Sequence, residues 1–146
     1  MYVRIGRFPE DDSDAEREVD IVVHAYDTWN ADHTIALIAL PLLKQLKETK
    51  HGVPYMDYED MPEHLQYIPK QYSSNYELFP EDDMWEPEFD RQVQVWNWMM
   101  DEMIWAMDQL ANDDQVDADV WYSREHGERM DNGLRLFGKY FRSLWD

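Results

Sequence analysis

The sequence predicts an α+β protein in which an N-terminal β-hairpin, or two neighbouring strands, packs on three main α-helices. Two segments rich in β-branched and aromatic residues, Tyr2–Phe8 and Val19–Tyr26, come first, and the acidic, turn-forming stretch Pro9–Glu16 separates them. Three long segments with helical spacing of apolar residues follow. Between the first two helices lies a Pro- and Tyr-rich segment, Val53–Pro87, that we expect to be mostly irregular.

The first helix is expected over about residues 31–50. Asn30 precedes it as an N-cap, and Asp32 lies in its first turn, where the helix dipole favours a carboxylate. From Ile35 to Leu43 the segment is apolar almost all round, which predicts a helix that is buried on most of its faces. Pro41 is expected to kink or split this helix.

The second helix is expected over about residues 88–111. One face is apolar and should form core: Val93, Trp96, Met100, Met103, Ile104, Met107 and Leu110. Trp98 and Trp105 project from the opposite side, beside Asp101, where a surface helix is ordinarily polar. Large aromatic side chains in that position indicate an interface, a ligand platform or cover by another segment of the chain.

The third helix is expected over about residues 123–144. Its apolar stripe, predicted to pack against the second helix, comprises Met130, Leu134, Phe137, Phe141 and Leu144. Arg135, Lys139 and Arg142 lie further round the same helix, and we call these three residues the cationic ridge. In an otherwise acidic chain, such a ridge either binds an anion or pairs with nearby carboxylates.

Composition excludes several classes of protein. The 146 residues fit one domain, 1–146, and a formal net charge of −19 disfavours direct DNA binding, because phosphate affinity comes from cations. That charge suits binding of a basic partner, imitation of nucleic acid, or solubility alone. Without cysteine the chain has no disulfides, thiol catalysis or Cys-ligated metal. The N-terminus is unlike a signal peptide, and the longest apolar run is too short to span a membrane.

No familiar catalytic motif occurs in the chain, so we expect a non-enzymatic protein without a cofactor. A metal site is a weaker hypothesis. Asp27, Asp32 and His33 could supply ligands at the junction between the second strand and the first helix, although their spacing matches no standard zinc motif. Helix capping explains the same residue types at this place.

The most specific site hypothesis joins Trp98, Trp105 and Asp101 to the cationic ridge. Aromatic faces can stack on a base and Arg or Lys can bind phosphate, so this surface could hold a small anionic, ring-containing ligand such as a nucleotide. It could equally be a homodimer contact. The plainer alternatives are packing of the tryptophans within the chain and pairing of the ridge with carboxylates.

Four segments of the chain resemble a family of small acidic proteins encoded by tailed bacteriophages. They are Tyr26–Ala36 (YDTWNADHTIA), Leu42–Pro54 (LLKQLKETKHGVP), Trp98–Ala106 (WMMDEMIWA) and Asn132–Asp146 (NGLRLFGKYFRSLWD). The family has no assigned activity, so the resemblance implies a setting, a phage gene expressed in the host bacterial cytoplasm, and no catalytic residue.

Three functions follow as hypotheses. The first is a phage accessory protein that binds a host or phage protein, for example to antagonise host defence by nucleic-acid mimicry or by sequestering a small signal. The second is a small metal-dependent enzyme that acts on nucleotides. The third is a structural virion or assembly component.

Overall fold

The computed structural model describes residues 1–7, 16–68 and 86–145. Its strands are β1 (Tyr2–Ile5) and β2 (Val19–Val22), and its helices are α1 (Ala31–Thr49), α2 (Glu86–Ala111), α3 (Ala118–Trp121) and α4 (Arg124–Lys139). This arrangement confirms the predicted α+β layout with three main helices. Most of the turn predicted between the strands, and Tyr72 and Tyr76 of the irregular segment, lie outside the described residues.

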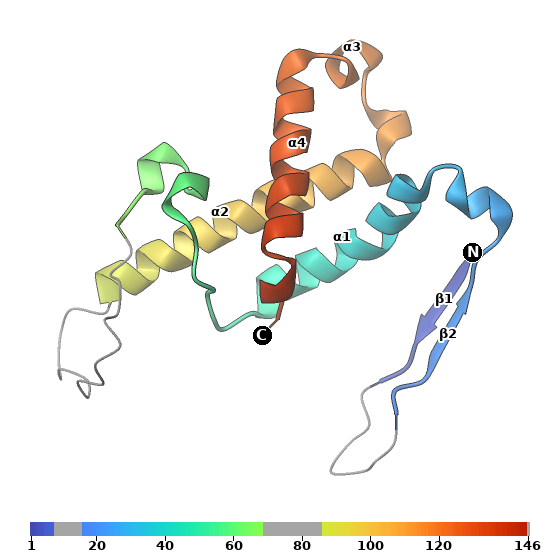
Figure 1. Ribbon diagram of the computed structural model, residues 1–146, viewed down its shortest axis with the longest axis horizontal. Coiled ribbons are helices and arrows are strands. Elements are labelled where there is room, and N and C mark those ends of the chain that lie inside the picture. Colours follow the sequence, from blue (N-terminus) through green and yellow to red (C-terminus); the bar gives the residue numbers. More distant parts are fainter. Residues whose placement is uncertain (8–15, 69–85, 146) are drawn as a thin grey trace.

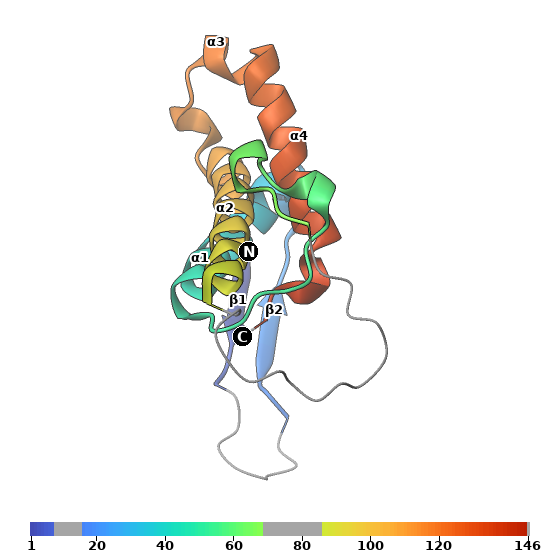
Figure 2. The ribbon, with the colours of Figure 1, turned by 90° about the vertical axis from the view of Figure 1, so that its left-hand side faces the viewer.

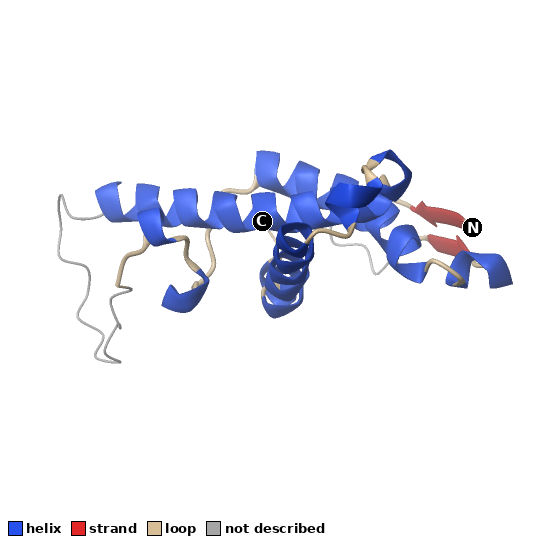
Figure 3. Cartoon of the chain, turned by 90° about the horizontal axis from the view of Figure 1, so that it is seen from above, coloured by secondary structure: helices blue, strands red, loops and turns tan. Residues whose placement is uncertain are grey.

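The three main helices form the body of the molecule (Figures 1 and 3). Helices α1 and α2 lie side by side, and α4 crosses α2 steeply, so that α2 contacts both of the others. The segment after α1 crosses the other end of α2 and forms two 3-10 turns, Tyr58–Asp60 and Glu63–Leu65. The described part of the irregular segment therefore belongs to the body.

Methionine dominates the core. The largest fully buried side chains are Trp96, Met56, Met99, Met100, Met103, Leu136 and Val95. Five of these come from α2: Trp96, Met100 and Met103 lie on the predicted apolar face, whereas Val95 and Met99 were not predicted as core. Unbranched methionine side chains adapt to irregular gaps, which suits a core where helices cross at steep angles.

Helix α4 is rotated relative to the predicted stripe. Met130 is buried as expected, but the other large buried hydrophobic residues are Leu136 and Tyr140, whereas Leu134 is 38% exposed and Phe141 is 60% exposed. Gly133 explains the rotation, because a Cβ at this position would lie 2.6 Å from the Glu102 carbonyl oxygen on α2. Only glycine permits this close approach of the two backbones.

Helix α1 also differs from expectation. It continues without a break through Pro41, and only Ala36 and Leu43 are buried, so the prediction of a helix buried on most faces is wrong. Proline leaves the carbonyl of Leu37 without a helical partner, but Leu37 is exposed, so water can solvate that carbonyl. One face of α1 packs on α2, and Ile35, Leu37 and Leu42 on its other faces are exposed in the part of the chain that the structure describes.

The β-hairpin extends away from the three helices (Figure 2). Its strands pair antiparallel, with Tyr2 opposite Val22 and Ile5 opposite Val19. A 3-10 turn, Ala25–Thr28, connects β2 to α1. Among the described residues, no helix combines the length and apolar character needed to cross a membrane.

Candidate functional site

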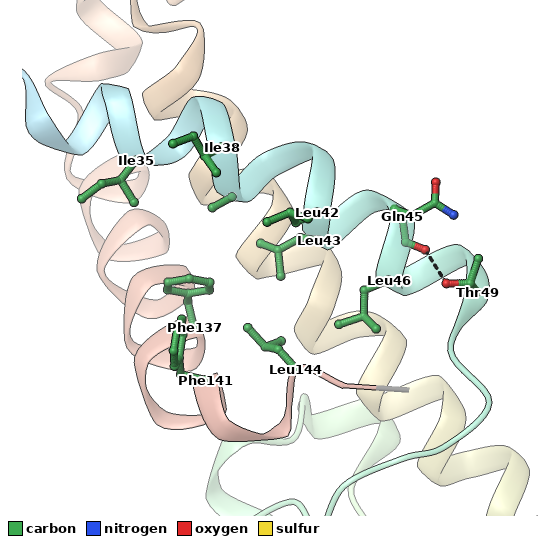
Figure 4. Close-up of a pocket in the computed structure, with 11 residues that line it drawn as sticks. Ile35, Ile38, Leu42, Leu43, Gln45, Leu46, Thr49, Phe137, Phe141 and Leu144 are labelled. Carbon is green, nitrogen blue, oxygen red and sulfur yellow. Dashed lines mark hydrogen bonds between the residues drawn. The ribbon is translucent and has the colours of Figure 1, made fainter. Parts of the chain in front are cut away.

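An open apolar groove lies between α1 and the C-terminal end of α4 (Figure 4). Its volume is about 690 Å³, and its lining residues are Ile35, Ile38, Ala39, Leu42, Leu43, Gln45, Leu46, Thr49, Phe137, Phe141 and Leu144. Leu42 is 63% exposed and Phe141 is 60% exposed, so large apolar side chains form its rim as well as its floor. A volume of this size lies within the range of small-molecule pockets, roughly 300–1,000 Å³.

The spacing of residues on α1 produces one wall of the groove. Ile35, Ile38, Leu42 and Leu46 recur at intervals of three and four, which places them on one face of the helix. The opposite wall comes from Phe137, Phe141 and Leu144, which point toward α1 in Figure 4. The Phe137 and Phe141 rings meet edge to face with centroids 5.4 Å apart, which holds this wall in place.

The groove carries no group suited to chemistry. Its polar side chains are Gln45 and Thr49, and the Thr49 hydroxyl donates to the Gln45 carbonyl at 2.9 Å. Neither residue is an acid, a base or a metal ligand of the usual kind. The groove can therefore bind an apolar surface but has no catalytic constellation.

The tryptophans on the other side of α2 already have partners within the chain. Trp98 is partly buried against the core. The Arg129 guanidinium lies 4.0 Å from the centre of the Trp105 ring, and the His126 ring lies 5.2 Å from it. Asp101 pairs with Lys47 of α1. These contacts match the alternative of intramolecular packing, and ligand stacking stays a prediction.

Arg129 of α4 also connects α4 to α2. Its guanidinium donates two hydrogen bonds to the buried Glu102 carboxylate, at 3.0 and 2.8 Å. The same planar group thus satisfies a buried charge and stacks on Trp105. This is a structural role that sequence analysis did not assign to Arg129.

Two members of the cationic ridge surround one buried carboxylate. Arg135 donates to Asp60 Oδ1 at 2.6 Å, and Lys139 Nζ lies 2.5 Å from Asp60 Oδ2. Lys139 also pairs with Asp57, and Arg135 with Asn132. Arg142, in the 3-10 turn Phe141–Ser143, is exposed. The structure therefore places Arg135 and Lys139 in the arrangement that the carboxylate-pairing alternative describes.

Asp60 and the residues that surround it shift one another's pKa values. Burial opposes ionisation of Asp60, but hydrogen bonds from Lys139, Tyr140 and Arg135 outweigh it and lower the pKa of Asp60. Burial and the contact with Asp60 raise the pKa of Tyr140 to about 12. Hydrogen bonds to Asp57 and Asp60 raise the pKa of Lys139. We call Asp60, Arg135, Lys139 and Tyr140 the Asp60 network.

Asp27 and His33, two of the residues proposed as metal ligands, have different hydrogen-bond partners. Asp27 accepts hydrogen bonds from the backbone of His24 at 2.7 Å and from the N-terminal amino group. His33 Nδ1 lies 2.8 Å from the Leu110 carbonyl oxygen. Asp32 is exposed in the first turn of α1. Within residues 1–7, 16–68 and 86–145, no three His, Asp or Glu side chains gather as a metal site would require.

Comparison with known proteins adds no precedent. No family model, curated protein or solved structure matches the chain.

Sequence analysis missed the groove. The feature that could have indicated the groove is the unbroken apolar run from Ile35 to Leu43. We interpreted this run as a helix that is buried on most of its faces. A run that is apolar on every face also fits a helix that packs on one side and leaves a binding surface on another. Periodicity cannot separate these cases, because it does not show which faces other elements cover.

Proposed function

We propose that this chain is a non-enzymatic phage accessory protein that acts by binding another protein through the groove between α1 and α4. The observation that carries the proposal is the groove itself: an open apolar surface whose rim residues Leu42 and Phe141 are each more than half exposed. Leaving such side chains in water forgoes about 1.5–3 kcal/mol for each aliphatic or aromatic group that could be buried. Surfaces of this kind in soluble proteins mark interaction sites.

The chemistry of the groove limits what it binds. Its lining is apolar, with Gln45 and Thr49 as the polar exceptions, so the bound segment presents a row of apolar side chains. The rest of the chain is acidic, with a net charge of −19, so basic residues on the partner would aid encounter. The phage setting rests on the four sequence segments that resemble phage proteins.

A capture experiment with matched variants tests the proposal. Tagged parent protein, Leu42→Asp and Tyr122→Asp are each incubated with lysate of infected host cells. Leu42 is 63% exposed in the groove and Tyr122 is 85% exposed on the turn after α3, so both changes should leave the fold intact. We expect a protein that the parent and Tyr122→Asp retain and Leu42→Asp loses, and purified samples of that protein should reproduce the difference by calorimetry.

Salt dependence separates the groove from charge mimicry. Binding through the apolar groove should change little between low and physiological ionic strength, whereas binding through exposed acidic residues should weaken steeply, because salt screens exposed charges within about 8–10 Å. Equal capture by all three proteins, or a complex that dissociates at physiological salt, would count against the groove. Metal content of the purified protein tests the alternative of a metal-dependent enzyme.

A further inference from the structure

One wall of the groove stands on a short turn that follows α4. Phe141 and Leu144 belong to this wall, but α4 ends before them and the 3-10 turn Phe141–Ser143 takes its place. The N–H of Ser143 donates to the Tyr140 carbonyl at 2.8 Å, and that of Leu144 donates to the Phe141 carbonyl at 3.3 Å. A 3-10 turn this short has little stability of its own, so contacts with other parts of the chain must hold the wall in place.

Tyr140 anchors the near end of this turn. It directly precedes Phe141 and is only 5% exposed. Its ring packs edge to face against Trp96 of α2, with the centroids 5.8 Å apart. Its hydroxyl donates to Asp60 at 2.8 Å and accepts from the backbone N–H of Asp57 at 3.0 Å. Both the ring and the hydroxyl of Tyr140 are therefore fixed, by two different segments of the chain.

The rest of the Asp60 network strengthens this anchor. The Asp60 side chain is 1% exposed, and Arg135 and Lys139 both pair with it. Hydrogen bonds between charged groups that are removed from water are stronger, and more specific in geometry, than those between neutral groups at a surface. Lys139 is the last residue of α4 and Tyr140 follows it. The network therefore fixes the direction in which the chain leaves the helix.

The far end of the turn contacts the core and the end of α1. Leu144 packs against the core, and the Trp145 ring lies 3.9 Å from the position that a Cβ would take at Gly52, just after α1. Between these two ends, Phe141 is 60% exposed and meets the Phe137 ring edge to face. More than half of Phe141 is open to water, so its position depends on Phe137 and on the anchored residues on either side of it.

We propose that the Asp60 network positions one wall of the groove: by fixing Tyr140 it places Phe141 and Leu144, and so determines how tightly the groove binds an apolar partner. This inference rests on the proposed function of the groove and names residues outside it that control its affinity. The four residues of the network are not among those that line the groove. A binding surface on a turn needs such support, because a wall that moves must be ordered on binding at a cost in affinity.

Tyr140→Phe tests the proposal, because it keeps the ring against Trp96 and removes only the hydroxyl. Hydrogen exchange followed by NMR measures how often the turn opens. We expect the amide protons of Ser143 and Leu144 to exchange at least about tenfold faster than in the parent, the effect of losing a hydrogen bond to a buried charged group. Exchange in α1, which forms the other wall, should stay the same. Unaltered exchange at Ser143 and Leu144 would overturn the proposal.

Arg129→Gln is the matched control for a general loss of stability. Arg129 makes a comparable pair with buried Glu102, in the N-terminal half of α4. The change weakens the packing of α4 on α2 without touching the turn, so Ser143 and Leu144 should exchange as in the parent. If Arg129→Gln speeds their exchange as much as Tyr140→Phe does, overall destabilisation explains the effect and the network does not position the wall.

Binding of the neutral apolar dye Nile red measures the consequence for the groove. The part of the dye binding that Leu42→Asp removes belongs to the groove, since Leu42 is 63% exposed on its rim. For that part we expect the Kd of Tyr140→Phe to rise about two- to tenfold, the factor for one more side chain that must be ordered on binding. Arg129→Gln should bind the dye like the parent. An equal Kd in the parent and Tyr140→Phe would refute the proposal, because the network would then hold the turn without affecting the groove.

The outcomes separate this inference from the proposed function. If Leu42→Asp loses a captured protein that Tyr140→Phe binds with the affinity of the parent, the groove is a binding site and only the positioning role of the network is wrong. If Leu42→Asp loses neither dye nor any captured protein, the groove is not a binding site. The proposed function is then wrong, and the effect of the network on binding is wrong with it, whatever the exchange rates of the turn.

Discussion

The hydroxyl of Tyr140 donates a hydrogen bond of 2.8 Å to Asp60, a residue that lies 80 positions earlier in the chain. The same hydroxyl accepts from the backbone N–H of Asp57 at 3.0 Å. Tyr140 thereby joins the C-terminal end of α4 to the 3-10 turn Tyr58–Asp60. The Asp60 side chain is only 1% exposed, so the cations around it compensate a charge removed from water.

Replacing Asp60 with Asn should destabilise the fold by about 2–4 kcal/mol, because the change leaves two cations and a buried hydroxyl without their shared carboxylate. Urea unfolding measures this difference. Asp57→Asn is the matched control: its side chain is 45% exposed, so that change should cost less than about 1 kcal/mol. Similar losses in both variants would show that burial of Asp60 does not matter.

The acid limb of the stability curve should depend on Asp60. Its pKa is lowered in the folded state, so ionised Asp60 contributes stability that is fully present above its ordinary pKa of 3.8 and is lost as pH falls through the lower folded value. The free energy of unfolding of the parent should therefore decline more steeply below pH 3.8 than that of Asp60→Asn. Parallel curves for the two proteins would contradict the assigned shift.

Gly133→Ala should destabilise the packing of α4 on α2 by about 1–3 kcal/mol, as overpacking of a close contact does. The added Cβ would lie 2.6 Å from the Glu102 carbonyl oxygen and 2.7 Å from Ala106 Cβ. Gly127 and Gly138 on the same helix are the controls, since a Cβ there meets nothing within 4 Å. Alanine at either should be neutral or stabilising by up to about 1 kcal/mol in thermal and urea unfolding.

Arg129→Gln should cost about 2–3 kcal/mol, since it removes the cation that satisfies buried Glu102 and stacks on Trp105. Trp fluorescence followed during urea unfolding reports the change. Arg124→Gln provides the comparison, because Arg124 is 89% exposed and pairs with Glu128 on the same helix, where we expect less than about 0.5 kcal/mol. A small effect at Arg129 would mean that Glu102 finds another partner.

Local patterns in the sequence determined the elements of this fold. β-Branched and aromatic residues predicted the strands at Tyr2–Ile5 and Val19–Val22, and helical spacing predicted α1 and α2 to within about two residues. The third helix, α4, ends at Lys139, five residues before its predicted end. These predictions succeed because side-chain direction in a strand or helix repeats with a short, known period. The unusual charge and the absence of cysteine are likewise properties of the sequence alone.

Only the tertiary structure decided how those elements face one another. The rotation of α4 depends on the contact between Gly133 and Glu102 of α2, and that contact buries Leu136 in place of Leu134. The partner of Arg135 and Lys139 is Asp60, a residue on a distant turn that no helical or strand period connects to α4. The groove exists because α4 ends beside α1 without covering Leu42. A sequence pattern shows which faces of an element are apolar, but contacts between distant segments determine which of those faces remain open to water.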